Sequence, residues 1–131
     1  MPVALRRDVP GWMDSNRAGF DAEALWKRVE GDPELLRELI GTFEIEFPGM
    51  LASVEGAIEH DDSVRLERAA HKIKGTMVQF SAGSAAAAAR ELEQLGRSGT
   101  LTGAGDALEK LRREILALVE RLHVMSRGIQ E

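Results

Sequence analysis

The sequence predicts an all-α protein, an up-down antiparallel four-helix bundle with an additional short N-terminal helix. Two observations support this. Ala, Leu, Glu, Arg and Lys make up about half of the 131 residues, a composition typical of long helices. Apolar residues also recur every three or four positions in long segments joined by mostly short polar turns. Residues that favour strands are sparse and Tyr is absent, so the composition does not favour a β-sheet.

The first two helices have clear start signals. Asp21 is a suitable N-cap for a short helix, because its side chain can accept from the free backbone amides of the first turn. Asp32 and Pro33 start a long helix over 32–59, with an acidic cap and a proline at the first helical position. Pro48 lies inside this segment. We expect it to bend the helix rather than end it, since the apolar stripe keeps its phase across it.

Three further elements follow. The apolar pattern predicts a helix from Ser63 to about Phe80, another over 85–95, a glycine-rich loop over 96–105 and a last helix over 108–125. Short connections make sequential helices antiparallel neighbours, which is the basis for predicting a bundle.

The chain divides into an N-terminal arm over 1–19, a bundle domain over 20–127 and a frayed C-terminal end over 128–131. The absence of Cys excludes thiolate metal sites and cysteine nucleophiles. A net charge of −5, with no local basic run, argues against a nucleic-acid partner. There is neither a membrane-spanning apolar run nor a signal-peptide core, so we expect a cytoplasmic protein without a membrane partner.

The helix that starts at Ser63 carries an unusual exposed face. At 100° per residue, His71 falls opposite the apolar stripe, with Arg68, Gly75 and Val78 on the same side and Lys74 on the flank. Glycine is costly in an exposed helix interior, and an apolar Val78 gains nothing from water, which indicates a spot that another surface approaches. Imidazole is a nucleophile near neutral pH, and a nearby ammonium would favour a phosphoryl group on it.

The residues around His71 also carry a resemblance. The run from Ala70 to Gly75, with sequence AHKIKG, resembles the Ala-His-x-Leu-Lys-Gly motif of histidine-containing phosphotransfer (HPt) domains. The similarity extends over about residues 20–120. It includes, in order and spacing, residues 20–25, residues 31–36, Phe43, Pro48 and residues 92–99. One departure is Ser81-Ala82, where many members have Gly-Ala at the turn.

The resemblance implies a phosphorelay carrier with a four-helix bundle fold. His71 would accept a phosphoryl group from a receiver-domain aspartyl phosphate and pass it to another receiver. Lys74 would orient the phosphoryl oxygens and Gln79 would offer a hydrogen bond. Arg68, Gly75 and Val78 are expected to contact the partner, and the helix over 32–59 to add to that surface.

No nucleotide-binding motif is present, so the expected protein is not a kinase. We assign no metal or other cofactor to the chain, because in this family the Mg²⁺ lies on the receiver. His60 and His123 are interpreted as a turn residue and a helix-surface residue. The expected partners are receiver domains of response regulators or hybrid histidine kinases, and we expect the chain to be a monomer.

Two alternatives remain open at this stage. The chain could be the phosphoacceptor module of a chemotaxis-type histidine kinase, with ATP as the phosphoryl source. It could also be a non-catalytic helical adaptor with an incidental His71, in which binding maps elsewhere, for example to the arm around Trp12. A dimerising kinase hairpin lacks the sustained heptad it requires, and a metal or haem bundle lacks inward-facing ligands.

Overall fold

The computed structural model describes residues 19–128. In this part of the chain all the named secondary-structure elements are α-helices. The five helices are α2 (Ala22–Arg28), α3 (Pro33–Glu59), α4 (Ser63–Gln79), α5 (Gly83–Ser98) and α6 (Ala104–Gly128). The all-α prediction is therefore confirmed. The predicted arm, with Trp12, and the end of the chain after Gly128 lie outside the described residues, apart from Gly19. None of the described helices has both the length and the apolarity needed to cross a bilayer.

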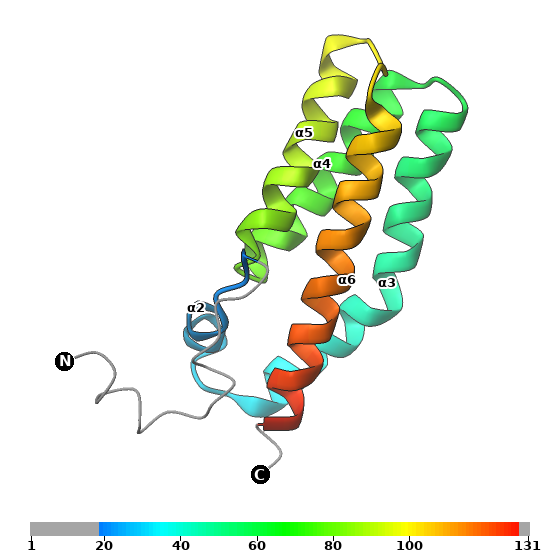
Figure 1. Cartoon of the computed structure of the whole chain (residues 1–131). Coiled ribbons are helices and arrows are strands. Elements are labelled where there is room, and N and C mark those ends of the chain that lie inside the picture. The colour runs from blue at the N-terminus through cyan, green and yellow to red at the C-terminus, as the bar shows by residue number, and fades with distance from the viewer. Residues whose placement is uncertain (1–18, 129–131) are drawn as a thin grey trace, which may run out of the picture.

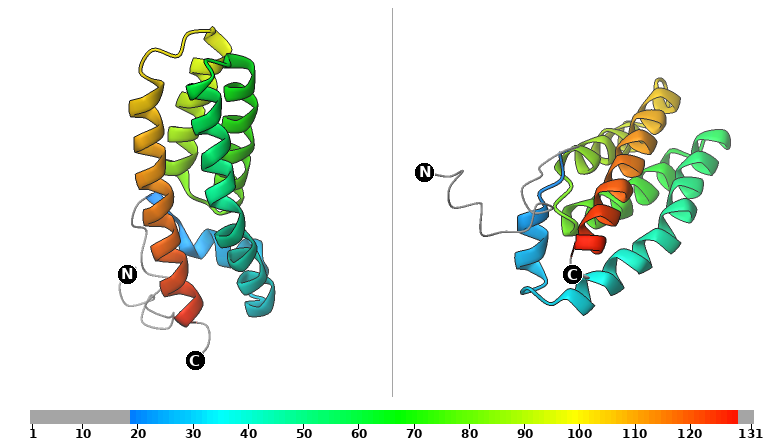
Figure 2. Two further views of the ribbon diagram at one scale, coloured as in Figure 1. Left: turned by 90° about the vertical axis from the view of Figure 1, so that its right-hand side faces the viewer. Right: turned by 60° about the horizontal axis from the view of Figure 1, so that its bottom comes forward.

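Helices α3 to α6 lie side by side, with α2 across one end (Figure 1). The α3–α4 and α5–α6 connections lie at one end of the bundle, and the α4–α5 turn lies toward the other. Because α3 and α6 are longer than α4 and α5, they extend past that turn, and α2 fills the space beside it (Figure 2). The most extensive helix–helix contact is that between α4 and α5.

The helix starts follow the predicted capping chemistry. The Asp21 carboxylate accepts a hydrogen bond from Ala24 N at 3.0 Å, and Asp32 caps α3 through two backbone amides. Asp62 caps α4 in the same way. Helix α3 continues through Pro48, as the unbroken apolar stripe predicted.

The core is built from the predicted apolar stripes. Each helix buries one face against the others, which is the arrangement that removes the most apolar surface from water. Fully buried side chains include Leu25, Leu36, Leu66, Ile73, Met77, Leu92, Leu111, Ile115, Leu118, Leu122 and Met125.

The glycine-rich loop is shorter than predicted. Helix α5 continues through Gly96 to Ser98, Gly99 closes it in the left-handed conformation with φ of 82°, and α6 already begins at Ala104. The prediction of a loop over 96–105 is thus wrong at both ends. Gly96 is not a helix breaker here. Gly96 is buried against α4, and only glycine fits there. A Cβ at this position would lie 2.5 Å from Glu67 N and 2.7 Å from Ser63 O, both backbone atoms of α4.

The α4–α5 turn contains Ser81 and Ala82. Ser81 adopts a φ of 57°, the left-handed conformation that glycine adopts at least cost. Its carbonyl accepts a hydrogen bond from Asp21 N at 3.0 Å, and Phe20 pairs with Ala82. The backbone of the turn therefore holds the start of α2 in place.

Replacing Gly96 with Ala should destabilise the fold by about 1–3 kcal/mol, because the added methyl group meets rigid backbone rather than a flexible side chain. Urea unfolding measures this loss. Gly105→Ala is the matched control: a Cβ there has no atom within 4 Å, so the same change should be neutral or slightly stabilising. Equal stability of the two variants would contradict the tight α4–α5 contact.

Candidate functional site

His71 stands on the outer face of α4, as predicted. Its side chain is 68% exposed, so the ring is open to an approaching partner. Its Nδ1 atom lies 2.6 Å from Oε2 of Glu93, which projects from α5. The ring is therefore exposed and at the same time held at one nitrogen by a neighbouring helix.

Glu93 is a buried carboxylate beneath this ring, with its side chain only 3% exposed. Its other oxygen, Oε1, accepts a hydrogen bond from Lys74 Nζ at 2.7 Å. The guanidinium of Arg97 lies 3.6 Å from Oε2 and also bonds Glu67 through Nε at 3.0 Å. The Lys74 hydrogen bond lowers the pKa of Glu93 and, together with the His71 contact, outweighs the opposing effect of burial. Glu93 is thus ionised at neutral pH.

This charge determines how the His71 ring is protonated. An ionised carboxylate can only accept hydrogen bonds, so Nδ1 of His71 must be the donor and carry the proton. In the neutral imidazole the lone pair then resides on Nε2. No group within residues 19–128 hydrogen-bonds to Nε2. The site therefore presents an exposed nucleophilic nitrogen whose ring orientation is set by the opposite nitrogen.

The structure places some of the predicted site residues around His71. Lys74 is 27% exposed and shares Glu93 with it. Gly75, one turn further along α4, has open space where a Cβ would be, and Val78 is half exposed beyond it. Arg68 lies on the α3 side of the exposed face and lines a groove between α3 and α4.

Gln79 is not brought to His71. Gln79 lies eight positions beyond His71 along α4, which is about 12 Å of helix. Gln79 instead lines a shallow hollow with residues of α2 and the start of α3, including Leu35 and Leu39. Its predicted hydrogen bond to a phosphoryl group has no support in this arrangement.

The role of Glu93 does not follow from the pattern of its own helix. In the sequence this residue stands out only as part of the family resemblance over residues 92–99. A signal was available, since Glu93 lies at the edge of the small-residue face of α5, one turn from both Ala89 and Gly96. A carboxylate next to such a face requires a cationic partner on the facing helix. Only the close α4–α5 packing identifies that partner as Lys74 together with His71.

The other two histidines lie elsewhere. His60 ends α3, where its Nδ1 atom lies 2.8 Å from the Gly56 carbonyl. His123 on α6 pairs with Glu44 on α3. Within the described residues there is no cluster of three or more His, Cys, Asp or Glu side chains that could hold a metal ion.

Glu93→Gln should lower stability by about 1–3 kcal/mol at neutral pH, because the charged acceptor of two hydrogen bonds is lost. Since folding lowers the pKa of Glu93, its ionised form stabilises the native state above the unfolded-state pKa of about 4.3. That contribution is lost as the pH falls through the lower, folded-state pKa. The stability difference between wild type and variant should therefore shrink in acid.

Chemical unfolding between pH 7 and pH 3 measures this difference. Glu91→Gln, an exposed carboxylate on the same helix, controls for the loss of one negative charge. Wild-type and Glu93→Gln stabilities that remain equally far apart down to pH 3 would contradict the ion-pair assignment.

Comparison with known proteins gives a family match but no individual relative. Searches of curated proteins and of solved structures return no significant match. The family model described as the Hpt domain matches residues 38–123, about two thirds of the chain, including all of α4 and α5. The chain therefore belongs to the Hpt domain family, whose members are phosphotransfer carriers in two-component signalling and interact with receiver domains.

Proposed function

We propose that this chain is a phosphorelay carrier in which Nε2 of His71 accepts a phosphoryl group from a receiver-domain aspartyl phosphate and passes it to another receiver. The observation that carries the proposal is the exposed ring held at Nδ1 by Glu93. The proposal treats α3 to α6 as an up-down antiparallel four-helix bundle, which the alternating ends of their connections support (Figure 1).

The transfer is a displacement at phosphorus. The lone pair of Nε2 forms the N–P bond while the P–O bond of the aspartyl phosphate breaks, and the aspartate leaves as a carboxylate. The phosphorylated ring keeps its Nδ1 proton and becomes cationic. Glu93 lies 2.6 Å from Nδ1, so its negative charge stabilises the positive charge that develops during the attack. In the reverse direction, a receiver carboxylate attacks the same phosphorus and Nε2 leaves as a neutral nitrogen.

Lys74 supports this step from the α5 side of the ring. Its ammonium donates one hydrogen bond to Glu93 and has two further donors. With 27% of its side chain exposed, Lys74 can offer these donors to phosphoryl oxygens above the ring. We assign the Mg²⁺ of the reaction to the receiver and propose no nucleotide site on this chain, which makes it a carrier and not a kinase.

The surface around His71 suits a receiver. Gly75 leaves open space beside the ring, and exposed Val78 lies one turn beyond. Leu35 and Leu39 are each 40% exposed at the start of α3, beside the hollow that contains Gln79. A transient partner needs only a small interface of this kind. The expected contribution of α3 to the docking surface is part of this proposal.

A phosphotransfer assay tests the function. The purified chain is mixed with a panel of labelled, aspartyl-phosphorylated receiver domains in Mg²⁺ buffer, and acid-labile, base-stable label is followed. We expect label on the wild type and none on His71→Gln, because the amide cannot act as the nucleophile. His123→Gln is the matched control and should be labelled like the wild type.

The donor decides between the alternatives. Label from ATP and a histidine kinase, without label from any receiver, would favour the kinase-module alternative. Equal labelling of wild type and His71→Gln, or no label from either donor, would reject the role of His71 and favour the alternative of a non-catalytic helical adaptor.

Gly75→Ala should separate stability from transfer. The open space at Gly75 allows a methyl group without a clash, and alanine favours an exposed helix interior by about 1 kcal/mol. Unfolding should therefore show a stability gain, whereas the methyl group beside His71 should slow transfer from the receiver at least severalfold. A stabilised variant that transfers as fast as the wild type would show that the open space has no part in docking.

A further inference from the structure

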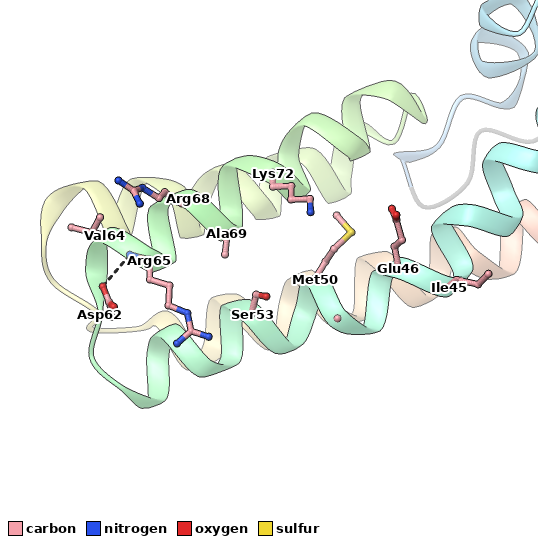
Figure 3. Close-up of a pocket in the computed structure, with 11 residues that line it drawn as sticks. Ile45, Glu46, Met50, Ser53, Asp62, Val64, Arg65, Arg68, Ala69 and Lys72 are labelled. Carbon is pink, nitrogen blue, oxygen red and sulfur yellow. Dashed lines mark hydrogen bonds between the residues drawn. The ribbon is translucent and has the colours of Figure 1, made fainter.

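A groove of about 650 Å³ runs between α3 and α4, on the opposite side of α4 from Glu93. We call it the basic groove, after Arg65, Arg68 and Lys72, which line it from α4. In Figure 3, Arg65 reaches from α4 toward α3, and Met50 points from α3 toward α4. The Arg65 guanidinium lies over Gly56, where a Cβ would come within 3.0 Å of it. The groove is thus an open channel between the helices with cations along one wall.

The charge of the groove differs from that of the chain. Helix α4 carries four cationic side chains and one carboxylate, in a chain with a net charge of −5. Within residues 19–128, no carboxylate lies within ion-pair distance of the side chains of Arg65, Arg68 or Lys72, whereas Lys74 on the other side of α4 is paired. Two carboxylates, those of Glu46 and Asp62, line the groove as well, so three cations against two anions leave it with a net charge of +1. The Asp62 carboxylate is also engaged as the cap of α4 through Arg65 N. The groove therefore favours a negatively charged occupant.

Apolar side chains mark the ends of the groove. Ile45 is 82% exposed and Val64 57% exposed, and Met50 is partly buried between them. The groove is open along its length rather than enclosed, and none of its charged side chains is buried. These features fit an extended protein segment with acidic and apolar side chains better than a small molecule.

We propose that the basic groove binds an acidic, partly apolar surface segment of the receiver that exchanges phosphoryl groups with His71. This inference rests on the proposed function. Lys72 follows His71 directly in the sequence, and Arg68 precedes it by one turn, so the groove is continuous with the exposed face around the ring. A receiver that reaches His71 covers this face of α4 and extends over the groove. Charge attraction there would speed association and select among receivers.

The test uses variants that lie away from His71. Arg65→Glu reverses one groove charge at the third position of α4, where an acidic residue suits the helix N-terminus. Ile45→Ser removes an exposed apolar side chain. Arg113→Glu and Leu116→Ser make the same changes on α6 and are the matched controls, since Arg113 is exposed in a hollow beside α5 and Leu116 is 51% exposed.

Transfer rates are measured against receiver concentration at low and high salt. For Arg65→Glu we expect the second-order rate constant to fall about tenfold at low salt, through a raised half-saturating concentration, with a smaller effect at high salt. Ile45→Ser should lower it severalfold at both salt concentrations. The two controls should stay within about twofold of the wild type. Direct labelling of His71 by phosphoramidate, which needs no receiver, should be equal in all variants.

Three outcomes would overturn the proposal. Groove variants that match their controls, with the wild type labelled by a receiver, would reject the groove and leave the proposed function intact. A wild type labelled by phosphoramidate but by no receiver would reject the proposed function and the groove together. Sedimentation showing a wild-type dimer that both groove variants dissociate would identify a second copy of the chain as the occupant.

Discussion

The close approach of α4 and α5 is the constraint on which the site depends. At Gly96 the two backbones lie so near that even one methyl group would overlap Glu67 and Ser63. The buried face of α5 is otherwise mostly alanine, so the helices stay close along its length. This spacing carries Glu93 to within hydrogen-bond distance of both His71 and Lys74. With longer side chains at the contact, the same carboxylate would lie too far away to hold the ring.

Burying Glu93 has a desolvation cost that its partners offset. A carboxylate in a low-dielectric position needs hydrogen bonds and opposite charge, and here Lys74, His71 and Arg97 supply them. The arrangement has a chemical consequence beyond stability. In the proposed transfer the His71 ring gains positive charge, and the negative charge of Glu93 beneath it is already in place. No rearrangement of α5 is needed at the moment of transfer, which is the condition under which electrostatic stabilisation is most effective.

The sequence predicted the parts of the structure that follow from local chemistry. The N-caps, the apolar stripes and the exposure of His71 depend on periodicity and on single residues, and they agree with the structure. The errors involve contacts between helices. The predicted loop over 96–105 included Gly96, because nothing in the local sequence shows that α4 passes beside it. The hydrogen bond between Glu93 and His71 joins two helices, so it depends on the distance between α4 and α5, which the pattern of either helix alone does not give. The place of Gln79 also depends on neighbouring helices, since it lines a hollow with residues of α2 and α3.

Gly75 and Gly96 show how far stability and function are separated on this helix pair. Glycine is needed at position 96 for packing, because backbone atoms of α4 occupy the space that a side chain would fill. Gly75 is exposed inside a helix with open space beside it, so the packing within residues 19–128 does not require glycine there. An exposed helical glycine costs about 1 kcal/mol relative to alanine, and no contact in the described structure offsets that cost. Gly75 lies one turn from His71, so in the proposed transfer the receiver would supply the contact that favours glycine at this position.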